Sequence, residues 1–103
     1  MPNTPEFYAS FLSVLTQIPN SRAKKMFGEA GFYVDEKFVG IAGEDTVFVK
    51  MTEGWDGAGC EQAAPYPGAK AHWILAKAVW QDVDGFAGIL QSTADSLPLP
   101  KKK

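Results

Sequence analysis

The chain has 103 residues, 46% hydrophobic and 21% charged, which predicts one folded domain over residues 1–103 rather than a disordered chain. No apolar run approaches the roughly 20 residues of a membrane span and no signal-peptide pattern begins the chain, so we expect a cytoplasmic protein with no membrane partner. The net charge is −2, and three of the ten basic residues lie in the segment 97–103, which we expect to be a flexible tail. The rest of the chain is more acidic, which disfavours binding of nucleic acid because that binding needs cationic side chains.

An amphipathic helix is expected over residues 5–18. Thr4 is suited to the N-cap, and Pro5 to the first helical position, where a missing N–H costs nothing. The apolar residues that recur at spacings of three and four are Phe7, Phe11, Val14, Leu15 and Ile18. This stripe predicts that one side of the helix packs on a core, and Pro19 ends the helix.

Beyond the helix the apolar period changes to two. It predicts four strands, near residues 23–27, 31–35, 38–42 and 46–51. Acidic turn sequences separate the later strands, and connections of only two to four residues join antiparallel neighbours. The sequence therefore predicts an antiparallel meander.

The next segment has no clear period. Either a frayed helix or coil is expected over residues 53–63, because each internal glycine weakens a helix by up to about 1 kcal/mol; the glycines are Gly54, Gly57 and Gly59. A fifth strand over 71–77 and a closing helix over 82–96 complete the chain. This order predicts a two-layer α+β domain, with an antiparallel four- to five-stranded sheet and helices on one face.

The motif Met26-Phe27-Gly28, followed by residues 31–35 (GFYVD) and 47–50 (VFVK), resembles the N-terminal domain of the TfoX/Sxy family. The resemblance covers about residues 7–95, although Glu29 stands where a second glycine is common. It implies a secretion-chaperone-like α+β fold and a regulatory role of the kind associated with natural competence in bacteria. The stretch PYPGAKAHWILA is similar to the YjbR/MmcQ group, which implies the same architecture and, as an alternative, nucleic-acid binding.

The segment FGEAGF invites comparison with phosphate-binding loops. A P-loop needs Gly-Lys-Ser/Thr at the start of a helix, whereas a strand is expected here and Glu29 would repel phosphate. We therefore interpret the residues as a structural corner in which glycines supply positive φ angles between strands. The motif consists of Met26, Phe27, Gly28 and Gly31.

No set of residues predicts an active site, a metal site or a cofactor. His72 and Cys60 are the only histidine and cysteine, too few for a histidine- or cysteine-based zinc site. Glu61 beside Cys60 opposes the formation of a reactive thiolate. We expect the chain not to be an enzyme.

Two features are candidates for binding. Arg22, Lys24 and Lys25 form a basic cluster that could contact an anion, although strand alternation sends the two lysines to opposite faces. Trp55 lies in a glycine-rich segment and is expected to be exposed, as aromatic residues at protein interfaces are. We predict a regulatory module that binds a protein partner or forms a homodimer; the alternative is nucleic-acid binding through Lys24, Lys25 and the tail.

Overall fold

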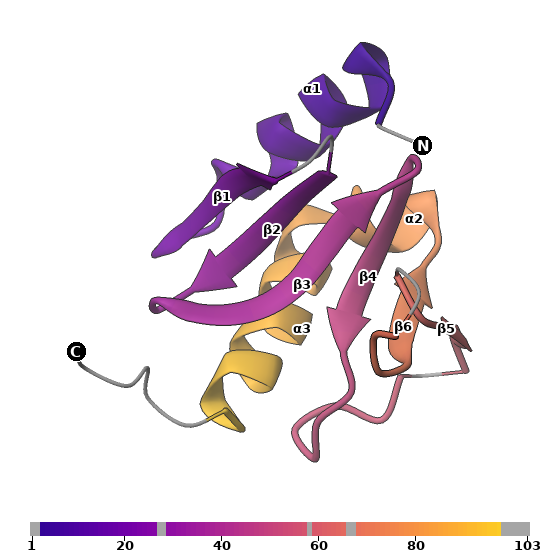
Figure 1. Ribbon diagram of the computed structural model, residues 1–103. Coiled ribbons are helices and arrows are strands. Elements are labelled where there is room, and N and C mark those ends of the chain that lie inside the picture. Colours follow the sequence, from indigo (N-terminus) through magenta and orange to yellow (C-terminus); the bar gives the residue numbers. More distant parts are fainter. Residues whose placement is uncertain (1–2, 27–28, 58, 66–67, 98–103) are drawn as a thin grey trace, which may run out of the picture.

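The computed structural model describes residues 3–26, 29–57, 59–65 and 68–97. A six-stranded antiparallel sheet runs in the order β1-β2-β3-β4-β6-β5, and Figure 1 shows helix α3 behind it. The two-layer α+β prediction is confirmed, with six strands in place of four or five. No helix within the described ranges is long and apolar enough to cross a membrane.

The first helix, α1, spans Pro5–Leu15 and begins as the sequence predicts. The Thr4 side chain accepts a hydrogen bond from the Phe7 N–H at 3.2 Å, which satisfies one of the free donors of the first turn. The helix ends at Leu15, before residue 18, and the carbonyl oxygens of Leu15 and Ile18 each lie 2.7 Å from the Ser21 hydroxyl, which shares its one hydrogen between them. Ile18 is buried although it lies beyond the helix.

The predicted meander is present. Its strands are β1 (Ser21–Met26), β2 (Glu29–Val34), β3 (Lys37–Gly43) and β4 (Thr46–Lys50). Two residues separate β2 from β3, and two separate β3 from β4; these four residues have φ angles of 54° (Asp35), 64° (Glu36), 51° (Glu44) and 57° (Asp45). Positive φ at both central residues is the type I′ turn geometry, whose twist matches that of the strands it joins.

Of the two alternatives predicted for residues 53–63, the weak helix is wrong, and residues 61–63 form a strand. Gly57 and Gly59 both have φ near 85°, a left-handed conformation that a right-handed helix does not accept. The segment instead forms an isolated bridge between Thr52 and Trp55 and then an edge strand, β5 (Glu61–Ala63). β6 (His72–Leu75) follows and pairs with both β4 and β5.

The C-terminal region contains two helices. A short helix, α2 (Lys77–Trp80), which the sequence did not predict, precedes the predicted closing helix, α3 (Val83–Asp95). The helices pack against one face of the sheet. The larger buried residues between the layers are Phe11 and Leu15 of α1, Phe32, Val34, Val39, Val47, Val49 and Leu75 of the sheet, Trp80 of α2, and Phe86 and Leu90 of α3.

Candidate functional site

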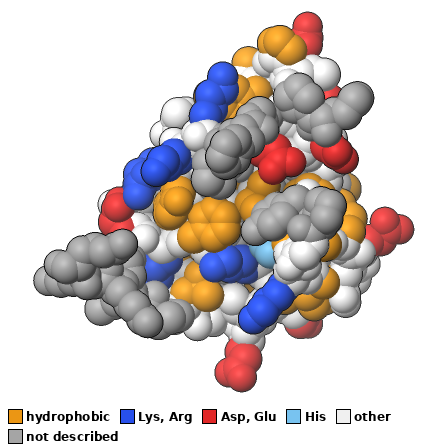
Figure 2. Space-filling view, in the orientation of Figure 1, with side chains coloured by type: hydrophobic (Ala, Val, Ile, Leu, Met, Phe, Trp, Pro, Cys, Tyr) orange, Lys and Arg blue, Asp and Glu red, His pale blue; other side chains and the backbone are white. Residues whose placement is uncertain are grey.

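The sheet face opposite the helices, called the open face below, is not covered by any helix of the described part of the chain (Figure 1). Its central side chains come from alternate positions of five strands: Arg22, Lys24, Tyr33, Phe38, Ile41, Phe48, Lys50, His72 and Ile74. Figure 2 shows hydrophobic groups in the middle of this face, with lysine and arginine side chains among them and acidic groups mostly at its margin. The same alternation places Glu29 of β2 and Glu61 of β5 on this face, so the open face carries groups of both signs.

Four of these side chains form a line across the strands, which we call the cation–ring row: Arg22, Tyr33, Phe38 and Lys50. The Arg22 guanidinium lies 4.3 Å from the centre of the Tyr33 ring, and the Tyr33 and Phe38 ring centres are 5.3 Å apart. The Lys50 Nζ lies 4.9 Å from the centre of the Phe38 ring. Each cation is close enough to an aromatic ring for a favourable cation–π contact.

The row depends on an irregularity in β3. Phe32 pairs with Gly40 and Tyr33 pairs with Phe38, so Val39 is an extra residue at a β-bulge. Val39 is fully buried against the helices, and the bulge allows Phe38 to lie on the open face beside Tyr33. Regular alternation from Gly40 would have placed Phe38 on the helix-covered face.

The predicted basic cluster divides between the two faces. Arg22 and Lys24 lie on the open face, whereas the Lys25 Nζ lies 5.5 Å from the centre of the Tyr8 ring of α1. Arg22 also pairs with the Glu36 carboxylate at 3.1 Å, and this hydrogen bond raises the pKa of the arginine. The cluster is therefore not one patch, and the structure joins Arg22 to Lys50 through the two aromatic rings instead.

Of the four residues of the corner motif, the structure describes Met26 and Gly31. Phe27 and Gly28 lie outside the described residues, and β1 and β2 pair up to Met26 and Glu29 on either side of them. Gly31 was expected to contribute a positive φ angle, but it lies within β2, paired with its neighbours on both sides, and its φ is not positive. The prediction for Gly31 is wrong because β2 begins two residues earlier than the sequence pattern indicated.

Trp55 is half-buried rather than exposed. Its ring meets the Trp73 ring edge to face, with the ring centres 6.2 Å apart and an interplanar angle of 77°. Both rings pack against the core cluster, an arrangement that explains the aromatic residue in this glycine-rich segment without an interface. A contact of Trp55 with a partner remains a prediction.

Cys60 and His72 do not face each other. The β5–β6 register sets Ala63 opposite His72 and Glu61 opposite Ile74, so Cys60 lies beyond the pairing. The His72 Nδ1 lies 2.9 Å from the Lys70 carbonyl oxygen, and burial raises the pKa of the Cys60 thiol. The structure therefore provides no cysteine–histidine pair for nucleophilic catalysis.

We predict slow alkylation of Cys60 in the folded protein. Burial raises the pKa of its thiol, so at neutral pH less of it is the reactive thiolate than in the unfolded chain. Iodoacetamide should react severalfold more slowly with the native chain than with the same chain in urea, and the native rate should rise with pH. Equal rates in the two states at pH 7 would contradict this.

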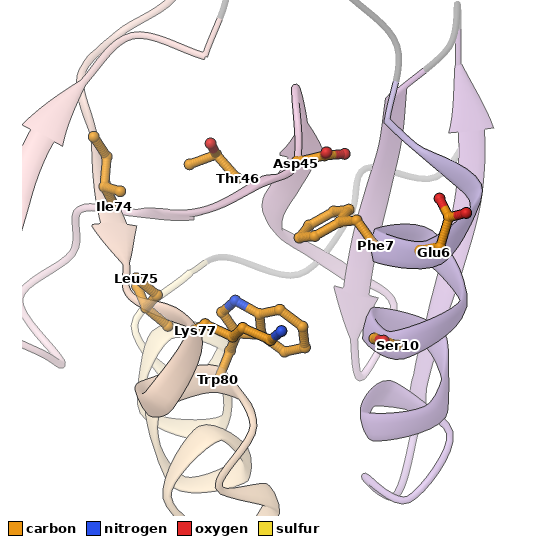
Figure 3. Close-up of a pocket in the computed structure, with 9 residues that line it drawn as sticks. All are labelled: Glu6, Phe7, Ser10, Asp45, Thr46, Ile74, Leu75, Lys77 and Trp80. Atoms are coloured by element: carbon orange, nitrogen blue, oxygen red, sulfur yellow. The ribbon is translucent and has the colours of Figure 1, made fainter.

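A pocket of about 430 Å³ opens between the start of α1, the β3–β4 turn and α2 (Figure 3). The Phe7 and Trp80 rings, whose centres are 5.6 Å apart, form part of its apolar lining. Its polar lining residues are Glu6, Ser10, Asp45, Thr46 and Lys77. Asp45 is already engaged, because its carboxylate accepts a hydrogen bond from the Thr4 N–H at 2.6 Å.

The pocket brings hydroxyls, two carboxylates and a lysine together, but among the described residues no hydrogen bond joins a hydroxyl of the pocket to a side chain that could act as its base. It has hydroxyls on Ser10 and Thr46, but no histidine lines it. Across the described residues, no group of three or more histidine, cysteine, aspartate or glutamate side chains is placed to hold a metal ion. The open face is therefore the stronger candidate for the functional surface.

Comparison with known proteins identifies similarity to a protein family and to a bacterial protein. A family model described as the TfoX N-terminal domain matches residues 13–96. The uncharacterized 12.7 kDa protein in the trpE 5′ region of Spirochaeta aurantia is 39% identical over 88 residues, which cover 80% of this chain and 72% of that protein.

Proposed function

The chain belongs to the TfoX N-terminal domain family, and from that premise we propose that it is a non-enzymatic regulatory module that binds another protein through its open face. One observation carries the proposal: the helices lie on one side of the sheet, while the other side presents the cation–ring row. Aromatic and arginine side chains are the residues on which binding energy concentrates at protein interfaces. A second copy of the chain is one form that the partner takes in this proposal.

The absence of enzymatic activity belongs to the same proposal. Within the described residues the candidate nucleophile, Cys60, has a raised pKa and no histidine opposite it. The pocket beside α1 contributes hydroxyls without a histidine. These arrangements support binding rather than chemistry as the role of the chain.

The test compares two tyrosines, each with a cation over its ring. Tyr33→Ser removes a ring of the cation–ring row, and Tyr8→Ser removes a similar ring from the helix side of the molecule. We expect Tyr33→Ser to weaken partner binding or dimerisation at least about tenfold, since an aromatic residue central to an interface contributes roughly 2 kcal/mol or more. Tyr8→Ser should leave binding unchanged.

The measurement is sedimentation velocity over a range of concentrations for self-association, with affinity capture from a lysate of the native host for other partners. Circular dichroism of each variant checks that it is folded. Two results together would contradict the proposal. The chain would stay monomeric, and every protein that it captures would be captured equally by the Tyr33→Ser variant.

A second candidate function, binding of single-stranded nucleic acid, is favoured by the same row, because aromatic rings on a sheet stack with bases and neighbouring cations contact phosphates. The negative net charge and the position of Lys25 on the other face count against it. A gel shift with a labelled oligonucleotide decides: salt-sensitive binding that Tyr33→Ser abolishes supports this candidate instead of the protein partner.

A further inference from the structure

We propose that Lys50, Lys70 and His72, at the β6 side of the open face, form a binding site for a phosphate-type oxyanion. This site is independent of whether the open face binds a protein. It rests on the backbone pairing of these residues, on the hydrogen bonds of His72, and on the lack of acidic partners for the two lysines.

The pairing of β4 with β6 places Lys50 beside His72, and Lys70 lies close to His72 along the chain. Lys50 of β4 is the direct cross-strand partner of His72 of β6, and side chains opposite each other in such a pair have Cβ atoms about 5 Å apart. Lys70 lies two residues before His72, and its carbonyl oxygen is 2.9 Å from the His72 Nδ1. Since a carbonyl oxygen only accepts, Nδ1 carries a proton, and this contact fixes the ring beside Lys50.

The two lysines form a cationic pair without a counter-ion. Burial, and after it the positive charge of Lys70, lower the pKa of Lys50, so each ammonium lies within the field of the other. Neither makes an ion pair with the described residues, and the Lys50 Nζ lies 4.9 Å from the centre of the Phe38 ring. An anion between the two ammonium groups would turn their repulsion into attraction for a shared ligand.

His72 has an unused hydrogen-bonding group at the same place. It is buried, with 7% of its surface exposed, and its Nε2 has no hydrogen-bond partner among the residues that the structure describes. Buried side-chain nitrogens in native proteins nearly always have a partner, so the Nε2 of His72 has the capacity for one further hydrogen bond. The nitrogen is covered in this structure, so the lysines meet an incoming anion first and His72 joins after a local adjustment.

The neighbouring strand β5 places no carboxylate directly opposite His72. On β5 the residue opposite His72 is the uncharged Ala63; Glu61, which is exposed, lies opposite Ile74. Phe38 adjoins the site and touches Tyr33 at a ring-centre distance of 5.3 Å. Positive charge therefore meets aromatic surface at one end of the cation–ring row.

A phosphate group matches these donors and acceptors. Its P–O oxygens accept from both ammonium groups, and a P–OH can donate to a neutral Nε2, or a P–O can accept from the protonated ring. Inorganic phosphate, a nucleotide and a phosphorylated side chain all present this group. Ligands with a planar ring would gain contact with Phe38 as well.

The experiment uses His72 as its own reporter, because it is the only histidine in the chain. The proton NMR signal of its imidazole C2–H is followed at fixed pH while inorganic phosphate is added, and a parallel series adds chloride to the same ionic strength. We expect a saturable shift with phosphate and none with chloride. In Lys50→Gln and Lys70→Gln the dissociation constant should rise at least about tenfold.

Lys24→Gln, which removes a lysine of the open face at the other end of the sheet, is the matched control and should leave the phosphate affinity unchanged. A linear shift that chloride reproduces, or the same affinity in both site variants and the wild type, would overturn the proposal. Adenosine monophosphate, phosphotyrosine and phosphoserine then identify the source. Tighter binding of the two ring-bearing ligands would indicate that Phe38 takes part, whereas equal affinities would assign recognition to the phosphate alone.

Discussion

Replacing Phe11 with alanine should lower the free energy of unfolding by about 3–5 kcal/mol, a large part of the stability of a domain of this size. Phe11 is fully buried where α1, the sheet, α2 and α3 meet. Its ring centre lies 5.1 Å from that of Phe32, 5.9 Å from that of Trp80 and 6.2 Å from that of Phe86. The substitution would leave a cavity that three different elements line, and no single one can move to fill it.

Urea unfolding followed by tryptophan fluorescence measures this loss, and the buried Trp80 beside Phe11 makes the signal sensitive to it. Ser13→Ala, an exposed position on the same helix, is the control and should change stability by less than about 0.5 kcal/mol. A loss below 1 kcal/mol for Phe11→Ala would mean that the helices do not share this core.

Gly40→Ala should be nearly as damaging, although it adds only one methyl group. A Cβ at Gly40 would overlap the backbone carbonyl oxygen of Phe48 and the Cζ atom of Phe32. The Phe32 ring is itself fixed in the core, and the carbonyl belongs to the neighbouring strand, so neither can yield cheaply. We expect a loss of about 3 kcal/mol or more, at the upper end for overpacked sites.

Gly88→Ala provides the matched control. Gly88 lies in α3, and a Cβ there would meet no atom within 4 Å. Alanine should therefore stabilise the helix by up to about 1 kcal/mol. Thermal unfolding should show the two variants shifting in opposite directions from the wild type; equal effects would contradict the close contact at Gly40.

The two proposals for the open face have different consequences. If the cation–ring row is a protein interface, replacing Tyr33 weakens partner binding and replacing Lys70 does not. If the phosphate site exists, Lys50 and Lys70 determine anion affinity whether or not Tyr33 is present. The variants therefore distinguish the two proposals. Binding of a phosphorylated protein partner would depend on Tyr33 and on both lysines.

Much of the fold follows from the order of residues alone. The apolar stripe of α1, its Thr4 cap and the stripe of α3 are local patterns with a period near 3.6, and they predicted these helices to within a few residues. The alternation in β2, β3 and β4, with very short connections, predicted the meander. Residues 13–96 also carry enough of the TfoX N-terminal pattern for the family resemblance to be recognised from the sequence.

The errors arose where local preference conflicts with long-range contacts. β5 has only three residues, and its strand conformation depends on hydrogen bonds to β6, which no local pattern reveals. Trp55 was predicted to be exposed because glycines surround it, yet its ring packs against that of Trp73, 18 residues further along the chain. The turns Asp35-Glu36 and Glu44-Asp45 were placed correctly, but their positive φ angles were not foreseen because glutamate has no preference for that region.

The sequence by itself determined the fold class, the family and most helix and strand positions, because these depend on the spacing of apolar residues along a few turns of the chain. Only the tertiary structure decided which side chains are neighbours on the open face. A bulge at Val39 aligns Phe38 with Tyr33, and the β4–β6 register sets Lys50 opposite His72. Lys50 and His72 become neighbours through pairing between strands that are distant in sequence, and the bulge accompanies the burial of Val39 against the helices, so neither arrangement can be read from a short stretch of residues.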